Sequence, residues 1–416
     1  MNSPAFLFMT CQIGAEPALK KEISREHPEL RFAYSRPGFV TFKSVDPELL
    51  IHPKYEIRSV FARSYGMSLG KVKGTNPVEQ VLALAKELVD RMALKKKEKD
   101  GLEGEPKKLL RLHVWERDRY PKGEEALGYL DHQLSDQTYA DLLAADRQGL
   151  FHFNSGSAAT AQSPEKEDLV LDVIILEEPV QGNSGEAGLQ ADWWVGCHIH
   201  SPSHSPAPGG KPRIVLPDAS PSRAYLKLEE AIRWSQAPIA PGDTAVEIGS
   251  APGGASFALL ERGLHVVGID PGEMAPQVLH HANFSHIQRP VGTVLREELP
   301  DQVEWLLLDM NVEPRISVYA VDRLVSRMNS CLLGVFLTIK LNQWSFADQI
   351  PDWMAHVKAM GMSRVRAIQL SHNRQEILIY GITLQGLKRS SIYRPDAPGA
   401  SRTPESQRPK IIKKSI

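Results

Sequence analysis

The spacing of hydrophobic and polar residues changes near residue 214, and this change divides the chain. From there to about residue 385, short apolar runs alternate with segments of helical spacing. Such runs are typical of strands buried on both faces, and their alternation with helices predicts an α/β domain with a Rossmann-like, doubly wound parallel sheet. The expected strands are Ala245–Ile248, His265–Ile269, Trp305–Leu308 and Val335–Ile339.

The first 200 residues have shorter and less regular patterns, which predict two small α+β modules, at 1–65 and 66–200. The first has expected strands at Phe6–Met9 and Phe39–Phe42 around a helix at Glu16–Ile23. The second has an expected helix at Val78–Leu94 and expected strands at Leu109–Trp115 and Leu169–Leu176. Its charge-mixed stretch (95–108) and its Gly/Ser-rich stretches (154–164 and 181–190) are expected to be solvated loops.

Two further segments are set apart by composition. Residues 201–213 are rich in Ser, Pro and Gly, which predicts a linker, and residues 386–416 carry eight Lys and Arg against two acidic residues. We expect this tail to be a disordered basic arm, which either contacts phosphate or only aids solubility. The whole chain, with 49 basic and 50 acidic residues, has no such bias, so any basic surface must be local.

Composition argues against several classes of protein. Cys11, Cys197 and Cys331 are too far apart for a disulfide framework or a zinc knuckle, which favours a reducing, cytoplasmic location. The first residues lack the basic and long apolar regions of a signal peptide. No run of 18 apolar residues is present, so we expect no membrane-spanning helix.

A glycine-rich segment at 244–256 (TAVEIGSAPGGAS) is the strongest single motif. It follows an expected strand, and ligands of parallel sheets bind at the carboxyl ends of strands. The glycines fit neither the dinucleotide fingerprint nor a P-loop. Asp270, at the end of the next strand, can accept hydrogen bonds from ribose hydroxyls. A loop without phosphate chemistry and an acidic ribose ligand together favour S-adenosylmethionine as the cofactor.

Four charged residues are expected to meet in the same crevice. Lys227 lies on a predicted helix at 221–231, Asp309 and Lys340 end apolar strands, and Glu376 begins one. Charges at the ends of apolar strands are costly unless they are paired. Two lysines in a desolvated site would lower a lysine pKa, and the neutral amine could then take the proton of a sugar hydroxyl.

These features resemble the FtsJ-type RNA 2′-O-ribose methyltransferases over residues 214–385. The order of Lys227, Asp309, Lys340 and Glu376 is similar to the K-D-K-E tetrad of that family, and VEIGSAPGG is similar to its cofactor loop. The resemblance implies that Lys340 is the general base, that Asp309 orients it and favours the sulfonium, and that the other two hold the substrate hydroxyl. The resemblance also implies that the reaction requires no metal ion. The implied cofactor-binding residues are Glu247, Gly249, Ser250, Ala251, Pro252, Gly253, Gly254, Ala255, Asp270 and Asp309.

Within this family, the sequence is most similar to bacterial enzymes that methylate the RNA of the large ribosomal subunit. The similar segments are 217–231, 248–255, 269–279, 339–342 and 372–380. That resemblance implies a cytidine 2′-hydroxyl in 23S rRNA as the substrate and a THUMP-like RNA-binding module near the N-terminus. Two positions depart from the pattern: Glu247 stands where the family more often has Asp, and Ala255 replaces its usual Trp.

Other chemistries fit less well. Methylation of a base amino group usually needs an Asn/Asp-Pro-Pro-aromatic loop, which the residues after Asp309 lack, and methylation of a base carbon needs a cysteine nucleophile. Cys331 lies in a helical pattern, which favours a core thiol. Cys197–His200, with His204, suggests a metal, but no carboxylate or second cysteine is near in sequence, so we expect none. A non-catalytic RNA-binding or ribosome-assembly factor, and a small-molecule or protein methyltransferase, stay open as alternatives.

Overall fold

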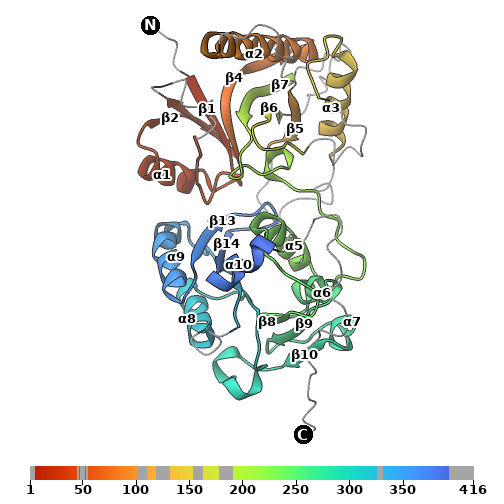
Figure 1. Cartoon of the computed structure of the whole chain (residues 1–416), viewed down its shortest axis with the longest axis vertical. Helices are drawn as coiled ribbons and strands as arrows, with labels where there is room; N and C mark the ends of the chain where they lie inside the picture. Colours follow the sequence, from red (N-terminus) through yellow and green to blue (C-terminus); the bar gives the residue numbers. More distant parts are fainter. Residues whose placement is uncertain are drawn as a thin grey trace, which may run out of the picture. The chain divides into compact units, whose positions relative to one another are not determined.

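The chain divides into two compact units, Met1–Arg213 and Ile214–Ile416, which the computed structural model in Figure 1 shows. The structure describes residues 5–44, 46, 52, 55–100, 110–118, 132–152, 163–177, 191–325 and 331–392. Among these residues, no helix is both long enough and apolar enough to cross a membrane.

The N-terminal unit is built on one seven-stranded sheet with the order β2-β3-β1-β4-β7-β6-β5. Neighbouring strands are antiparallel except for β5 and β6. The strands are β1 (Ala5–Thr10), β2 (Leu30–Arg36), β3 (Phe39–Ser44), β4 (Ser64–Gly74), β5 (Arg111–Glu116), β6 (Leu169–Glu177) and β7 (Ala191–Ile199), and the helices are α1 (Glu16–Glu26), α2 (Pro77–Asp100) and α3 (Gln133–Ala145).

The two expected α+β modules share this sheet. The expected boundary at residue 65 falls at the start of β4, which pairs with β1 on one side and with β7 on the other. A buried cluster that includes Phe8, Phe39, Trp115 and Ile174 joins residues from both halves. The two halves therefore bury their apolar surface together, as one hydrophobic core.

The segment expected to be a linker, 201–213, packs on the N-terminal sheet instead. It contains the short 3₁₀ helix η3 (Pro208–Gly210), and a Cβ at Gly209 would lie 2.3 Å from the ring of Trp115. Lys211 donates a hydrogen bond to the carbonyl of Glu116 (3.0 Å) and pairs with Asp118. A Ser, Pro and Gly composition predicted irregular backbone correctly, but irregular backbone can still pack tightly.

The structure describes only part of the segments of the N-terminal unit that were predicted to be loops. Helix α2 runs through the first part of the charge-mixed stretch, up to Asp100. The rest of that stretch (101–108), residues 154–162 and residues 181–190 lie outside the described residues. Residues 95–99 (KKKEK) are all Lys or Glu, which are good helix formers, and this explains why the helix continues past Leu94.

The C-terminal unit has a second seven-stranded sheet, ordered β10-β9-β8-β11-β12-β14-β13. It is parallel apart from β14, which runs antiparallel between β12 and β13. The strands are β8 (Thr244–Ile248), β9 (His265–Ile269), β10 (Phe284–Ile287), β11 (Trp305–Asp309), β12 (Gly334–Lys340), β13 (Arg364–Ile368) and β14 (Glu376–Ile382). The alternation of strands and helices thus predicted the doubly wound sheet correctly.

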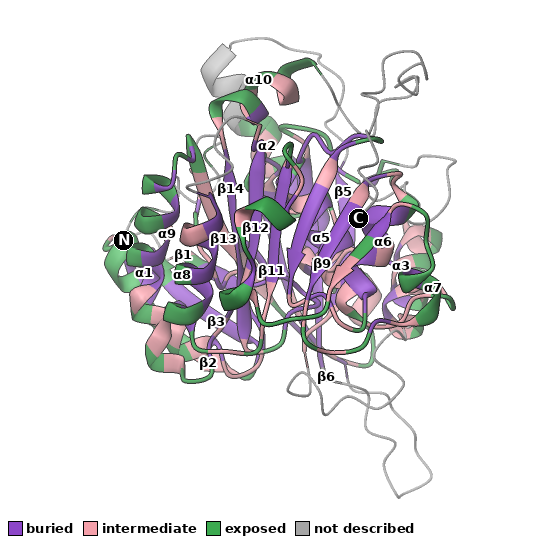
Figure 2. Cartoon of the chain, turned by 90° about the horizontal axis from the view of Figure 1, so that it is seen from below, coloured by how far each residue is buried: buried purple, intermediate pink, exposed green. Residues whose placement is uncertain are grey.

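Helices cover both faces of this sheet, and Figure 2 shows its strands buried between them. On one face, Leu228 of α5 and Leu259 of α6 join a cluster with Leu307 and Phe336, whereas α8 and α9 contact the other face. The main helices are α5 (Ala224–Ser235), α6 (Gly254–Glu261), α8 (Pro314–Val325), α9 (Ile350–Ala359) and α10 (Leu384–Ile392), with the short α7 at Pro276–Leu279.

The expected basic tail begins later than residue 386. Helix α10 extends to Ile392, and Arg389 in its last turn donates a hydrogen bond to Asp243 at 2.9 Å. The first seven residues of the expected tail therefore belong to the folded unit. The remainder, 393–416, lies outside the described residues.

Glu230 connects helix α5 to the segment that precedes β14. Its buried carboxylate accepts hydrogen bonds from the backbone amides of Ser371 (2.7 Å) and His372 (2.9 Å) and contacts the His372 ring at 2.6 Å. Burial alone would raise the pKa of Glu230, but these three groups outweigh it and hold the pKa below its usual range. The contact fixes the loop that leads into β14.

We expect Glu230→Ala to lower the free energy of unfolding by about 2–4 kcal/mol at pH 7, because two buried amides lose their acceptor. A carboxylate with a depressed pKa stabilises the fold above its unfolded-state pKa and loses this effect in acid. The difference between wild type and variant should therefore shrink below about pH 4. Denaturant unfolding at both pH values measures it. The exposed Glu261→Gln is the control, and an equal loss in that variant would contradict the assignment.

Candidate active site

The carboxyl ends of β8 and β11 form the natural ligand crevice of the C-terminal sheet. The chain leaves β8 towards β9 on one side, while β11 pairs with β8 on the other. The strand order reverses at this point, and sheets of this type bind ligands where that happens. The glycine-rich segment connects β8 to α6 at this position.

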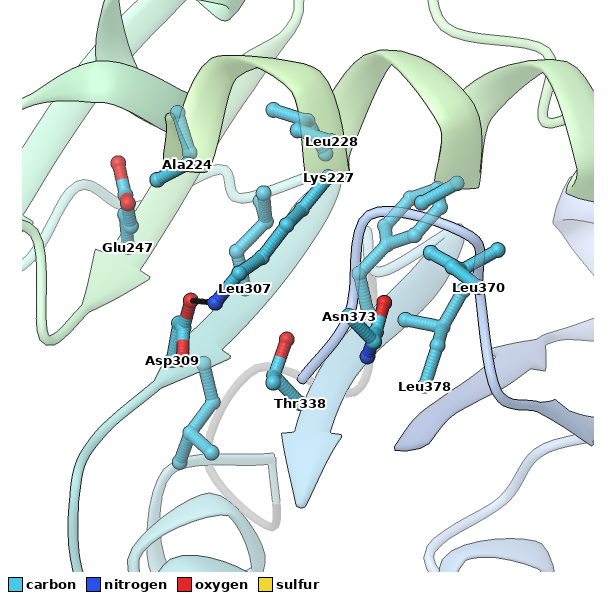
Figure 3. Close-up of a pocket in the computed structure, with 14 residues that line it drawn as sticks. Ala224, Lys227, Leu228, Glu247, Leu307, Asp309, Thr338, Leu370, Asn373 and Leu378 are labelled. Carbon is cyan, nitrogen blue, oxygen red and sulfur yellow. Dashed lines mark hydrogen bonds and ion pairs between the residues drawn. The ribbon is translucent and has the colours of Figure 1, made fainter. Parts of the chain in front are cut away.

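The four predicted charged residues meet in this crevice. Lys227 Nζ lies 3.1 Å from Asp309 Oδ2 and 2.7 Å from Glu376 Oε1. Lys340 Nζ lies 2.7 Å from Asp309 Oδ1 and pairs closely with Glu376 Oε2. Each lysine therefore touches both carboxylates, and each carboxylate touches both lysines. The dashed line in Figure 3 marks the contact of Lys227 with Asp309.

The fold explains why these residues meet. Lys340 and Glu376 face each other as partners in the antiparallel β12–β14 pair. Asp309 ends β11, the other neighbour of β12. Lys227 reaches them from α5, whose apolar side packs on the sheet. Three adjacent strand ends and one helix thus supply the four charges.

The pairing raises the pKa of Lys340, contrary to the expectation of a lowered one. Desolvation lowers this pKa, but the contacts with Asp309 and Glu376 outweigh it. Likewise, burial raises the pKa of Asp309, and Lys227 and Lys340 reverse that and lower it. The prediction counted the second lysine but gave too little weight to two carboxylates in contact. In this state, Lys340 holds its proton.

The cofactor loop depends on two glycines with left-handed backbone. Gly249 has φ of 81°, and a Cβ there would lie 2.4 Å from the carbonyl oxygen of Asp309. Gly253 has φ of 111° and packs against Met274 and Val278. L-residues rarely adopt such φ values, so glycine is required at both positions. The turn consequently lies against the strand end that carries Asp309.

Asp270 holds the loop from the neighbouring strand end. Its carboxylate accepts hydrogen bonds from the backbone amides of Ala251 (3.2 Å) and Gly272 (2.6 Å). A carboxylate has about four acceptor sites, so two backbone bonds leave capacity for ribose hydroxyls. These two bonds hold Asp270 beside the glycine-rich turn.

Glu247 is buried beside the tetrad and accepts a hydrogen bond from Ser256 Oγ at 2.5 Å. Burial, with Asp309 and Asp270 nearby, raises the pKa of Glu247 to about 8 against the opposing effect of Ser256. The resemblance implies that Glu247 keeps the carboxylate that Asp more often supplies in the family. With a pKa of about 8, the side chain is mostly the neutral acid at neutral pH, because burial and two nearby carboxylates disfavour its charge.

A pocket lies beside the tetrad. Its lining includes residues that the sequence predicted for catalysis and residues that it predicted for cofactor binding. Figure 3 shows Lys227, Glu247 and Asp309 around it, with Asn373 and Thr338 on the opposite side. Ala255 also lines this pocket, so its small side chain leaves open the space that the usual Trp would fill. Asn373 was missed as a site residue, although it lies in the segment HNRQE that precedes the tetrad glutamate.

The other predicted loop residues shape the loop. Ser250 is buried with Oγ 3.6 Å from Met274 Sδ, the carbonyl of Pro252 accepts a hydrogen bond from Ala275 N (3.0 Å), and Gly254 packs on Ser222. Cys331 precedes β12, at the opposite end of that strand from Lys340. That position separates the thiol from the crevice and does not fit a nucleophile for base-carbon methylation.

Comparison with known proteins agrees with this geometry. Residues 220–403 match the family described as FtsJ-like methyltransferase. The "Ribosomal RNA large subunit methyltransferase M" of Alkalilimnicola ehrlichii is 36% identical over 185 residues, which cover 42% of this chain and 50% of that protein. The protein of the same name from Halorhodospira halophila is 33% identical over 179 residues, with the same coverage.

The chain thus spans about half the length of these curated relatives. Among solved structures, TrmN from Thermus thermophilus covers 91% of this chain and 99% of its own, at 12% identity and a TM-score of 0.31. That likeness is too weak to assign a function. The family match spans all four residues of the tetrad and the glycine-rich loop. Residues 220–403 are therefore similar to the FtsJ-like methyltransferase family.

Proposed function

We propose that this protein is an S-adenosylmethionine-dependent RNA methyltransferase that modifies a ribose 2′-hydroxyl. The observation that carries the proposal is the closed ring of Lys227, Asp309, Lys340 and Glu376 beside the cofactor loop. Two lysines and two carboxylates can bind a hydroxyl, remove its proton and balance the charge without a metal. Their place at the reversal of strand order fits a bound cofactor.

The loop and its neighbours fit S-adenosylmethionine. The backbone turn at 249–254 would approach it, Asp270 would accept hydrogen bonds from its ribose, and Asp309 would lie near its positive charge. When bound, the cofactor supplies an electrophilic methyl group on a sulfonium. The role of the protein is then to align the 2′-oxygen with that methyl carbon, and positioning of this kind accounts for much of the rate.

Lys340 is the proposed general base, and its raised pKa in the resting ring means that it must be activated. A lysine loses its proton more readily when a second positive charge comes close. Asp309 would lie beside the sulfonium charge of a bound cofactor, and that charge would favour the neutral form of Lys340. A substrate hydroxyl that hydrogen-bonds to Glu376 would also compete for one of the carboxylates that hold the ammonium. The ring therefore keeps the lysine charged until both reactants are bound.

We propose that the N-terminal unit presents the RNA. Phe32 and Tyr34 of β2 are exposed, and Lys20 and Lys71 lie 4.8 and 5.6 Å from their respective ring centroids. Exposed aromatic rings beside lysines suit unpaired bases and phosphates. A THUMP-like module is part of this proposal. The names of the relatives support RNA of the large ribosomal subunit as the substrate, with a cytidine of 23S rRNA as the specific proposal.

Replacement of Lys340 tests the proposal directly. We expect Lys340→Ala to reduce methyl transfer to unmodified 23S rRNA by about 10³-fold or more, because the proposed general base is lost. Transfer of tritium from labelled cofactor measures the rate, and an alkali-resistant dinucleotide identifies the 2′-O-methyl product. The exposed Lys358→Ala should retain full activity. Unchanged transfer by Lys340→Ala would exclude this residue as the base.

A second test separates cofactor binding from catalysis. Asp270→Ala should weaken binding of S-adenosylmethionine by about 10- to 100-fold, because a bidentate ribose acceptor is lost. Isothermal titration calorimetry gives the affinity, with the exposed Asp301→Ala as the control. If the wild-type chain binds no cofactor, the protein is instead the non-catalytic RNA-binding factor considered above.

Glu247 should make the stability of the C-terminal unit depend on pH. A carboxyl with a raised pKa stabilises the fold below its unfolded-state value and loses this effect as the pH rises through its folded pKa of about 8. Glu247→Gln keeps the shape of the neutral acid, so the variant should exceed wild type in stability by about 1–4 kcal/mol at pH 9 and match it near pH 5. Thermal melting across this range would refute the assignment if the two curves stay parallel.

A further inference from the structure

Three metal-ligand side chains lie together on one face of the N-terminal sheet, and none of them belongs to the tetrad. His113 of β5 and Asp172 of β6 are direct partners in the parallel pair. Asp172 is opposite Gly196 of β7, and His198, two residues further along β7, projects on the same face. The sheet therefore brings together residues separated by up to 85 positions in the sequence.

The three side chains lie close together and are buried. Asp172 Oδ2 lies 2.6 Å from His198 Nδ1, and Asp172 Oδ1 lies 3.8 Å from His113 Nδ1. One nitrogen or oxygen ligand atom from each of the three residues lies within 4.8 Å of the other two. Their exposed fractions are 1% for His113, 0% for Asp172 and 4% for His198.

Several buried polar atoms in and beside this cluster have no hydrogen-bond partner in the described part of the chain. Asp172 Oδ1, His198 Nε2 and His204 Nε2 are buried and have no hydrogen-bond partner there. A buried carboxylate oxygen without a partner is costly, and native structures contain few of them. The unpaired oxygen faces the 3.8 Å gap to His113, where a cation would satisfy it.

We propose that His113, Asp172 and His198 bind a divalent transition-metal ion of the zinc type. Two imidazole nitrogens and one carboxylate oxygen are a ligand set that zinc prefers. Around a tetrahedral zinc, neighbouring ligand atoms lie about 3.3 Å apart, given bonds of roughly 2.0–2.1 Å. The two distances from the carboxylate, 2.6 and 3.8 Å, lie on either side of that value.

The surroundings support a structural ion. The His204 ring stacks on His198 with centroids 4.4 Å apart, and Tyr65 lies 4.2 Å from His204 on the other side. Neutral imidazole nitrogens and carboxylate oxygens are the groups that bind such ions, and a bound cation would compensate the buried charge of Asp172.

The ion would link three strands to the segment that covers them. His113, Asp172 and His198 come from β5, β6 and β7, and His204 belongs to the 201–213 segment that packs on the same sheet. Because binding energy of a structural metal adds to folding energy, removal of the ion should loosen this part of the N-terminal unit. The methyltransferase tetrad takes no part in it.

The test uses the full chain, purified without chelators and then dialysed against Zn²⁺. Inductively coupled plasma mass spectrometry should find about one zinc per chain in wild type and less than about one fifth of that in His198→Asn, because one ligand is lost. His356→Asn, an exposed histidine of α9, is the matched control and should keep the metal. Replacement with Co²⁺ should give the visible absorption of a four-coordinate ion.

A wild-type measurement guards against a variant that does not fold. Dipicolinate should lower the melting temperature of wild type by about 5 °C or more, and added Zn²⁺ should restore it. Zinc that is absent from wild type after dialysis, or equally retained in His198→Asn, would overturn the proposal. All these readouts are independent of methyl transfer, so failure of the metal site and failure of the proposed enzyme activity are distinguishable.

Discussion

The candidate active site depends on mutual neutralisation of two lysines and two carboxylates at the ends of apolar strands. None of the four could be buried there alone, because an unpaired charge at such depth would cost several kcal/mol. Together they form a closed ring in which every contact joins opposite charges. The antiparallel insertion of β14 beside β12 is what brings Glu376 to Lys340. The ring thus links the topology of the sheet to its chemistry.

The same ring controls protonation of the site. Its carboxylates raise the pKa of Lys340 and keep it charged, whereas burial and the nearby Asp309 and Asp270 raise the pKa of Glu247 to about 8. One crevice therefore contains a lysine that holds its proton and an acid that also holds its proton. In the proposed mechanism, the arrival of a cationic cofactor changes both, since a positive charge lowers the pKa of a lysine and of a carboxyl alike.

Compensation of buried charge also matters in the N-terminal unit, where one buried carboxylate is only partly compensated. Asp172 is buried, as Glu230 is in the C-terminal unit. Glu230 is satisfied by two backbone amides and a histidine, whereas Asp172 keeps one oxygen without a hydrogen-bond partner among the described residues. The satisfied carboxylate connects a helix to a loop. The unsatisfied one is the reason to propose an ion, because buried charge must be compensated by some group.

The sequence by itself determined the class of the C-terminal fold, the position of the glycine-rich loop and the four charged residues that meet beside it. Apolar runs that alternate with helical segments leave few packing solutions, and parallel strands place their carboxyl ends at one edge. The order of strands and helices along the chain was therefore enough to predict that Lys227, Asp309 and Lys340 would meet. The left-handed glycines of the loop are likewise a local property.

Only the tertiary structure decided the electrostatics and the distant contacts. The direction of the Lys340 pKa depends on how closely two carboxylates approach it, and no spacing along the chain gives that distance. The cluster of His113, Asp172 and His198 was hidden for the same reason, since its carboxylate is 26 residues from His198 in sequence and pairs with it across the sheet. The continuous N-terminal sheet was also missed, because strand pairing across a long insertion is a non-local event. Sequence patterns report local preference, whereas burial, charge compensation and strand partners depend on the assembled fold.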